Sequence, residues 1–295
     1  MNWTEGTILG LVQGLTEFLP VSSSAHLRVV AALAGWDDPG AAFTAVTQIG
    51  TAAAVIVYLR SDIARLGRAW FGSLPLSAGS TGADARDTEA QAADARLAWL
   101  IAFGTVPIGA CGYLFEDVVK GRLRDLRLMA GALAGVGLLL GAADRWADRR
   151  PGDRKPLAEL SARDGLLIGL AQATALIPGV SRSGATIGGG LVLRYSREAA
   201  SRFSFLLAVP AVAVSGAFGL HRLYREARQP TSTVAWGPLA GASVVAFLVG
   251  YAAIAWFLRY VGGNDFTPFV AYRVGLGLLL LALVLAGRTE AIPAA

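Results

Sequence analysis

Polar residues interrupt an otherwise apolar run near the start of the chain, in the stretch QGLTEFLPVSSSAH at positions 13–26. Gln13 and Glu17 are four residues apart, so a helix places both side chains on one face. The turn after them adds three hydroxyls and an imidazole, those of Ser22, Ser23, Ser24 and His26. A carboxylate beside a hydroxyl and a histidine can activate a nucleophile, and a carboxylate can also hold a divalent cation against a phosphate group.

A second polar interruption offers different chemistry. The stretch PGVSRSGATIGGG at 178–190 combines one arginine with hydroxyls and glycines. Its candidate residues are Gly179, Ser181, Arg182, Ser183 and Thr186. Arginine, hydroxyl groups and the free N–H groups of glycine-rich turns together bind phosphate oxygens. If the two stretches meet, they form one site for a phosphate-bearing substrate.

The elements that must position these residues are membrane helices. The chain has 295 residues, of which 54% are hydrophobic and 16% charged, whereas soluble domains average about 25% charged residues. Six apolar runs approach or exceed the ~18 residues that a membrane span needs. These runs are Phe43–Leu59, Leu97–Phe115, Leu128–Ala143, Phe203–Leu220, Trp236–Leu258 and Pro268–Ala286. We therefore expect an all-α polytopic membrane protein with six transmembrane helices. The net charge of +5 does not indicate nucleic-acid binding, because most arginines lie in short loops, where they set membrane orientation.

The two polar stretches lie in apolar segments that are broken halfway. Each half has about 10–14 residues, which is too short to cross a bilayer alone. The halves are Thr7–Leu19, Ala25–Ala34, Gly165–Ile177 and Ala185–Leu193. Backbone broken by Pro, Gly and Ser at membrane depth is tolerated only where it is buried in protein or lines a wet cavity. We expect two re-entrant helical hairpins whose tips carry the polar residues.

The two hairpins also resemble each other. GTILGLVQ (6–13) and GLLIGLAQ (165–172) share Gly, Gly, Leu and Gln at equal spacing, and VSSS (21–24) and VSRS (180–183) keep the same offset. Weak symmetry between broken helices indicates an inverted repeat with a site near the membrane midplane. We expect a single domain over 1–295, with repeats at about 1–143 and 160–290 and a flexible cytoplasmic loop at about 72–94. The excess of Lys and Arg on the face that carries this loop predicts a cytoplasmic face there and both termini outside.

Four ionisable residues fall at membrane depth: Glu17, His26, Arg182 and Arg273. Such groups are costly in a bilayer, so they are functional candidates. Structural alternatives remain open, because a serine-rich break could cap two short helices and one Glu could pair with one Arg as a buried structural ion pair. Arg273 lies near the end of a span, where it would either snorkel to the interface or pair with Asp265.

The two polar stretches resemble the signature motifs of the undecaprenyl-pyrophosphate phosphatase family, the bacitracin-resistance membrane enzymes of bacteria. QGLTEFLPVSSSAH corresponds to the family's (E/Q)xxxE motif followed by PVSSxxH, and PGVSRSGATI corresponds to PGxSRSxxT. FSFLLAVP (203–210) and FTPFVAYRVGLG (266–277) resemble further family segments, so the resemblance covers nearly the whole chain. Gln13 stands where many members have Glu, which leaves Glu17 as the only acid of the motif.

The resemblance implies hydrolysis of undecaprenyl diphosphate to undecaprenyl phosphate and inorganic phosphate. It also implies a divalent-cation cofactor, Mg²⁺ or Ca²⁺, and recycling of this lipid carrier for cell-wall synthesis. The enzyme would lie in the bacterial inner membrane with its site open to the outer face. By matching motif positions, the resemblance makes Glu17 the critical acid, Ser23 the nucleophile, His26 the motif histidine and Arg182 the essential arginine.

These roles form one mechanism. We expect Glu17, alone or through a bound cation, to activate Ser23 for attack on the terminal phosphorus, while Arg182 stabilises the developing charge. A metal-activated water in place of Ser23 is equally compatible with the sequence. The residues expected to bind the substrate are Gln13, Ser22, Ser24, Gly179, Ser181, Ser183 and Thr186.

The expected partners are undecaprenyl diphosphate and membrane lipid, with no nucleic acid. A homodimer is compatible with the sequence, which does not specify the oligomeric state. The alternative function is transport, in which the chain would be a flippase for undecaprenyl phosphate, because inverted repeats with broken helices are also a transporter architecture.

Overall fold

A computed structural model describes residues 1–74, 85–115, 123, 125–150, 152–229 and 235–287, and the described residues form helices joined by short connections. The first half contains α1 (Trp3–Thr16), α2 (Ser23–Ala34), α3 (Gly40–Tyr58), α4 (Arg60–Gly72), α5 (Ala85–Leu114) and α7 (Leu126–Arg149). The second half contains α8 (Ala162–Ala173), α9 (Arg182–Val192), α10 (Arg197–Ala227), α11 (Trp236–Val261) and α12 (Thr267–Leu285). Among the described residues β-structure is limited to one isolated bridge, so the predicted all-α class is confirmed.

Long apolar helices make this a multi-pass membrane protein. Within the described residues, five helices are long and apolar enough to cross a membrane: α5, α7, α10, α11 and α12. Helix α3 reaches that length only together with α4, from which it is bent by 82° at Leu59. The predicted spans therefore correspond to five helices and one bent pair.

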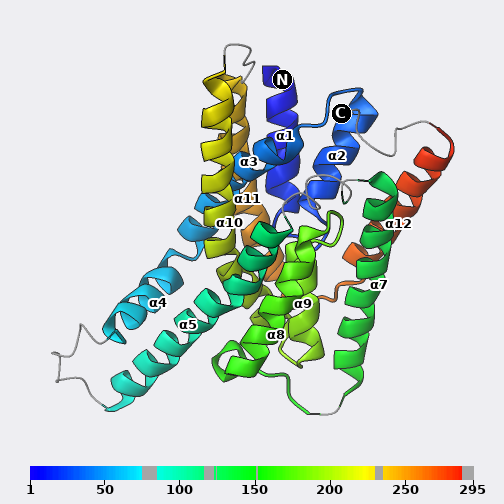
Figure 1. The fold of residues 1–295 in the computed structure, drawn as a ribbon. Coiled ribbons are helices and arrows are strands. Elements are labelled where there is room, and N and C mark those ends of the chain that lie inside the picture. The colour runs from blue at the N-terminus through cyan, green and yellow to red at the C-terminus, as the bar shows by residue number, and fades with distance from the viewer. Residues whose placement is uncertain (75–84, 116–122, 124, 151, 230–234, 288–295) are drawn as a thin grey trace.

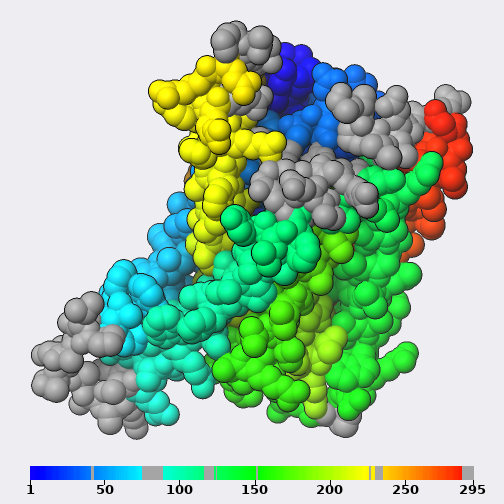
Figure 2. Space-filling view, in the orientation of Figure 1, coloured from blue at the N-terminus to red at the C-terminus, as the bar shows by residue number. Residues whose placement is uncertain are grey.

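The predicted flexible loop at about 72–94 is wrong over its second half. Helix α5 begins at Ala85, so residues 85–94 are helical, while residues 75–84 lie outside the described part of the chain. The segment ARDTEAQAAD lacks apolar periodicity but consists largely of strong helix formers, and their intrinsic propensity extends the helix beyond its apolar part. Figure 2 shows α4 and the first part of α5 projecting from the body of the molecule as an arm (cyan and teal). Trp70 and Trp99 pack edge to face within this arm, with ring centroids 5.5 Å apart.

Two short helix pairs, α1–α2 and α8–α9, carry the polar stretches at their tips. Figure 1 shows the α1–α2 pair in the upper half of the molecule and the α8–α9 pair in the lower half, with the two tips close together near the middle. Hydrogen bonds from Arg182 to Glu17 and from Ser183 to Leu19 join the tips directly. That each pair is a re-entrant hairpin in a membrane stays a prediction.

The two pairs also pack alike on long helices. Helix α1 lies along α11 and α8 lies along α5. At Gly10 a methyl group would come within 2.4 Å of the Ala242 carbonyl oxygen, and at Gly169 within 2.5 Å of the Gly104 carbonyl oxygen. Both contacts require glycine because helix backbones meet there, and both glycines belong to the repeated sequence stretches. The sequence repeat is therefore also a repeat of packing.

The far end of the α8–α9 pair is fixed by a buried polar cluster. The Asp164 carboxylate, in the first turn of α8, accepts hydrogen bonds from the Tyr195 hydroxyl at 2.8 Å and from the Lys155 ammonium at 3.3 Å. Burial raises the pKa of Tyr195, and its hydrogen bond to Asp164 raises it further, so the hydroxyl stays protonated as a donor. This cluster ties the start of α8 to the connection that follows α9.

Candidate active site

Glu17 stands at the end of α1, where the helix stops one residue before the broken turn. Phe18, the next residue, is buried and packs edge to face on Phe205 at 5.2 Å, which fixes the start of this turn. The Glu17 side chain is 4% exposed and both of its oxygens are engaged. Oε2 accepts from Gln13 Nε2 at 2.8 Å and from Ser23 Oγ at 2.6 Å. The predicted helical face shared by Gln13 and Glu17 is confirmed.

Arg182 reaches Glu17 from the other tip. Its Nη2 atom donates to Glu17 Oε1 at 2.9 Å, and the Arg182 side chain is 12% exposed. Its Nη1 atom donates to the Ala208 carbonyl of α10 at 3.3 Å. The prediction that the two polar stretches meet is therefore confirmed, and the Glu17 carboxylate is where they meet.

A strained turn presents the first-tip serines. Ser22 is the residue before α2 and has a φ of 75°, a left-handed conformation that costs a non-glycine residue about 1–2 kcal/mol. Ser181 holds the same position before α9 with a φ of 72°. These two residues are related by the offset of the sequence repeat. Strain of this kind persists where the surroundings impose it and is found disproportionately at functional sites. Here the turn brings the Ser23 hydroxyl onto Glu17, while the Ser24 hydroxyl lies 3.3 Å from that of Ser22.

His26 is held by two short hydrogen bonds. Its Nδ1 atom lies 2.7 Å from the Ser22 carbonyl oxygen, which can only accept, so Nδ1 carries a proton. Its Nε2 atom lies 2.7 Å from the hydroxyl of Tyr272 on α12, and the two rings stack at a centroid distance of 5.5 Å. Tyr272 was not among the predicted site residues. The available signal was its place beside Arg273 in the family-like segment 266–277.

Residues of the second tip mainly fix its shape. The Ser181 hydroxyl accepts from the Gly184 N–H at 3.1 Å, and the Ser183 hydroxyl donates to the Leu19 carbonyl of the first tip at 2.9 Å. Gly179 has a φ of 96°, and a methyl group there would come within 2.5 Å of the Met129 carbonyl oxygen. The buried Thr186 hydroxyl is bonded to the Arg182 carbonyl at 2.8 Å and to the Ser204 hydroxyl at 2.6 Å. Thr186 therefore contacts α10 and not the first tip, and its predicted role in substrate binding stays a prediction.

The position and partners of Arg273 differ from those predicted. It neither snorkels nor pairs with Asp265, because its side chain is fully buried at the junction of the tips. Its guanidinium group donates to carbonyl oxygens of both tips, at Pro20 (2.9 Å), Gly179 (2.9 Å) and Val180 (3.0 Å). It also donates to the Leu133 carbonyl of α7 at 3.1 Å. Broken turns leave carbonyl groups without helical partners, and a buried arginine with five donors satisfies several of them at once.

The charges at the tips favour an anionic ligand. Within the described residues, the two tips contain one carboxylate, Glu17, while two guanidinium groups, those of Arg182 and Arg273, lie against them. A cation buried without an equal counter-charge is costly, and an anion bound nearby lowers that cost. The polar stretches therefore form a positively charged site at the junction of the two tips, suited to phosphate.

The donor atoms of the site fit a hard divalent cation that is shared with a phosphate ligand. Glu17 provides a carboxylate, and the adjacent Gln13 Oε1 is buried and has no hydrogen-bond partner. Across the part of the chain that is described, no group of three or more His, Cys, Asp or Glu residues could enclose a metal. Mg²⁺ typically binds through one or two carboxylates and substrate phosphates, so Gln13 and Glu17 match a cation that arrives with its substrate.

Comparison with known proteins gives consistent results. A sequence model of the family described as bacitracin resistance protein BacA matches residues 6–279. Undecaprenyl-diphosphatase 3 of Frankia alni is 58% identical over 300 residues, covering 99% of this chain and 98% of its own. Undecaprenyl-diphosphatase 2 of Streptomyces avermitilis is 52% identical over 295 residues, covering 97% and 96%. Undecaprenyl-diphosphatase of Thermobifida fusca is 49% identical over 284 residues, covering 96% and 91%.

Proposed function

The chain belongs to the bacitracin resistance protein BacA family, and we infer that it is an undecaprenyl-diphosphatase of the membrane. It hydrolyses undecaprenyl diphosphate to undecaprenyl phosphate and inorganic phosphate, which returns the lipid carrier to cell-wall synthesis. Full-length relatives at 49–58% identity carry this name, and the two resembling motifs are the parts of the chain that form the site. No feature of the described residues favours the transport alternative.

One observation carries the proposal: a single carboxylate contacts both a hydroxyl nucleophile and an arginine from the opposite tip. Ser23 Oγ lies 2.6 Å from Glu17 Oε2, within the range for proton transfer to a general base. Arg182 lies 2.9 Å from the other Glu17 oxygen, so it borders the position of a phosphoryl group attacked by Ser23. Phosphoryl transfer depends mainly on such positioning and on charge stabilisation.

The reaction then proceeds in two displacements. Ser23 gives its proton to Glu17 and its Oγ atom bonds to the terminal phosphorus, while the bridging P–O bond breaks and undecaprenyl phosphate leaves. Glu17 releases that proton to the departing phosphate group, which restores its carboxylate. Water next attacks the phosphoserine and gives a proton to Glu17, the P–Oγ bond breaks, and inorganic phosphate leaves while Glu17 returns the proton to Ser23 Oγ. Arg182 stabilises the equatorial oxygens in both steps. In the alternative that the sequence leaves open, a water molecule replaces Ser23 and one displacement suffices.

A divalent cation, Mg²⁺ or Ca²⁺, is part of the proposal. When bound, it would neutralise charge on the diphosphate, and Glu17 with Gln13 would be its protein ligands. Gln13, Ser22, Ser24 and the second-tip residues Gly179, Ser181 and Ser183 would hold the diphosphate or shape the turns around it.

The proposed location is the bacterial inner membrane, with the site open to the outer face. Several arginines of the sequence belong to α4, to the end of α7 and to the start of α10, and these segments lie toward the lower end of the molecule in Figure 1. An excess of arginine marks the cytoplasmic side. In a Cys111→Ala background, a membrane-impermeant maleimide should label Asn2→Cys in intact cells and should not label Asp153→Cys. The reverse labelling pattern would invert the orientation.

Phosphate release from undecaprenyl diphosphate by the detergent-purified chain tests the function. Wild type should release phosphate, EDTA should stop release, and Glu17→Gln should lower it by at least ~10²-fold. Glu5→Gln, at the exposed start of the same helix, is the matched control and should remain active. A folded wild type that releases no phosphate with any divalent cation would refute the proposal. Mass spectrometry of acid-quenched enzyme distinguishes the two nucleophiles, because only attack by Ser23 leaves a phosphoserine.

A further inference from the structure

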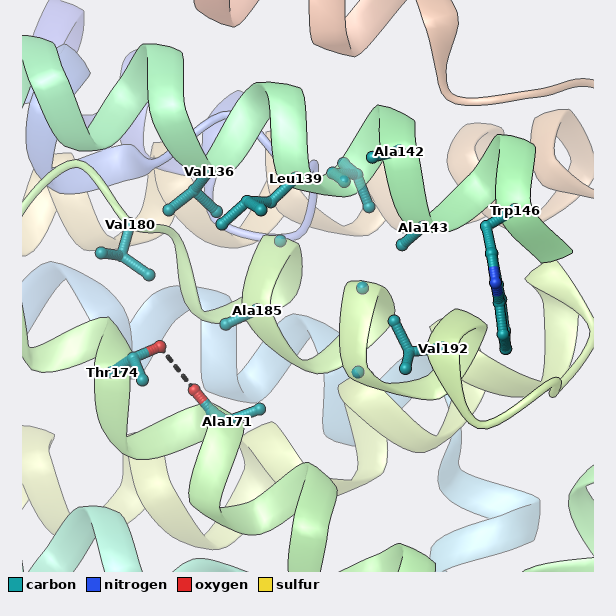
Figure 3. Close-up of a pocket in the computed structure, with 14 residues that line it drawn as sticks. Val136, Leu139, Ala142, Ala143, Trp146, Ala171, Thr174, Val180, Ala185 and Val192 are labelled. Atoms are coloured by element: carbon teal, nitrogen blue, oxygen red, sulfur yellow. Dashed lines mark hydrogen bonds between the residues drawn. The ribbon is translucent and has the colours of Figure 1, made fainter.

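An apolar cavity of about 640 Å³ lies between α7 and the α8–α9 pair. Figure 3 shows side chains from three helices around it, among them Val136, Leu139 and Trp146 of α7, Ala171 of α8 and Val192 of α9. The hydroxyl of Thr174, which also lines the cavity, donates to the Ala171 carbonyl at 2.7 Å, so it offers no free donor. Hydrocarbon is the chemistry that such walls accommodate.

The cavity begins at the tip that carries Arg182. Val180, Gly184 and Ala185 line the cavity, and in the sequence they flank Ser181, Arg182 and Ser183. One turn of backbone therefore faces the charged site on one side and the apolar cavity on the other. A ligand bound at this turn by its anionic head therefore has the apolar cavity within reach of its hydrocarbon chain.

The far end of the cavity has the character of a membrane interface. Trp146 lines it there, and the Arg150 guanidinium group stacks over the Trp146 ring at 4.6 Å. Tryptophan and arginine are enriched where a helix leaves the hydrocarbon layer. The lining residues thus extend along α7 and α9 from the second tip to Trp146.

Two glycines on the α9 side of the cavity leave volume that side chains would otherwise fill. A methyl group at Gly188 would find its nearest atom, Leu140 Cδ1, at 3.8 Å, and one at Gly189 would lie 3.4 Å from Ala171 Cβ. A methyl group is therefore tolerated at Gly188, while a larger side chain there extends into the open volume.

We propose that this cavity binds the isoprenoid chain of the lipid diphosphate, over the units nearest the diphosphate. The proposal rests on the proposed function, because it assigns the tail of that substrate. The occupant is the substrate chain and not bulk phospholipid, since Val180, Gly184 and Ala185 of the turn that carries Arg182 form one end of the cavity. The cavity then contributes binding energy that a substrate without a long chain does not receive, so it selects for chain length.

Chain-length dependence tests the assignment. Phosphate release is measured with undecaprenyl, farnesyl and isopentenyl diphosphates, using the full chain in detergent. In wild type, kcat/KM should rise strongly from the isopentenyl to the farnesyl substrate. Gly188→Leu should lower kcat/KM for the two long substrates by about tenfold or more and leave the isopentenyl substrate unchanged. An unchanged rate of the Gly188→Leu variant on isopentenyl diphosphate would also show that its active site is folded.

Two further variants distinguish loss of chain binding in the cavity from an effect of adding a leucine side chain elsewhere. Gly135→Leu places the same side chain on α7 at a position with nothing within 4 Å, so it should behave as wild type. Ala142→Leu fills the cavity from the opposite wall and should reproduce Gly188→Leu. Equal losses for all three substrates, or no loss for any, would overturn the cavity assignment, and the second result would mean that bulk lipid covers it. A wild type inactive on all three substrates would instead refute the proposed function.

Discussion

Glu17 and Arg182 are 165 residues apart in the chain, yet they form an ion pair of 2.9 Å between the two broken turns. Each residue belongs to a different half of the repeat, so neither half contains the site alone. The pair is largely buried, and a buried pair loses most when only one partner is removed. Whether it serves catalysis or only structure is decided by comparing single and double substitutions.

Glu17→Met and Arg182→Met should each lower phosphate release by at least ~10²-fold, and the double variant should be no more active than either single variant. Residues that act as one catalytic unit lose their function together, so their losses do not add. Activity is measured on undecaprenyl diphosphate, and thermal midpoints in detergent show whether the variants fold. If the pair were only structural, the double variant would remove both buried charges, regain stability and regain activity.

Arg273→Lys should destabilise the protein and inactivate it. An ammonium group has three donors on a point charge and cannot reach the Pro20, Gly179 and Leu133 carbonyls together. Each buried acceptor left without a donor costs about 1–3 kcal/mol, so a loss of several kcal/mol is expected. The thermal midpoint in detergent measures it.

Arg259→Lys is the matched control for this change, because Arg259 is exposed in the last turn of α11. It should keep the wild-type midpoint and activity. An Arg273→Lys protein that also kept both would show that the guanidinium contacts between the tips contribute nothing.

Sequence reasoning located the tips because proline, glycine and serine break helices for local reasons. The internal repeat also suggested that the tips meet at one site, and the Glu17–Arg182 contact bears this out. Sequence reasoning could not place Arg273, whose partners are backbone carbonyls that carry no residue-specific signal. Tyr272 was missed for a related reason: its contact with His26 joins residues 246 apart.

The start of helix α5 was also not predicted from the sequence. The loop predicted at about 72–94 lacks apolar periodicity, and periodicity reports only which face of a helix is buried. Residues 89–93 are exposed because they lie in the projecting arm, where helix propensity decides the structure. Solvent-facing helices of this kind are hard to separate from loops by hydrophobic pattern alone.

Gly10→Ala and Gly169→Ala should each destabilise the protein by about 1–3 kcal/mol. The new methyl group would lie 2.4 Å from the Ala242 carbonyl oxygen in the first case and 2.5 Å from the Gly104 carbonyl oxygen in the second. Gly135→Ala, where nothing lies within 4 Å, should instead raise stability by about 0.5–1 kcal/mol through helix propensity. Thermal midpoints in detergent compare the three. Equal midpoints would show that the close backbone contacts of the two repeats are not tight in solution.

Tyr272→Phe should lower phosphate release by about tenfold or more while leaving the thermal midpoint nearly unchanged. The substitution keeps the ring that stacks on His26 and removes only the hydroxyl that bonds to Nε2 at 2.7 Å. Released from Tyr272, the imidazole exchanges its fixed partner for water, while the Ser22 carbonyl just before α2 still accepts from Nδ1. The pH–rate profile should therefore change shape, whereas a purely structural defect would lower the rate equally at every pH. Tyr113→Phe, at a tyrosine that is 80% exposed, should leave both rate and profile unaltered. A Tyr272→Phe profile that superimposes on wild type after scaling would assign Tyr272 to packing alone.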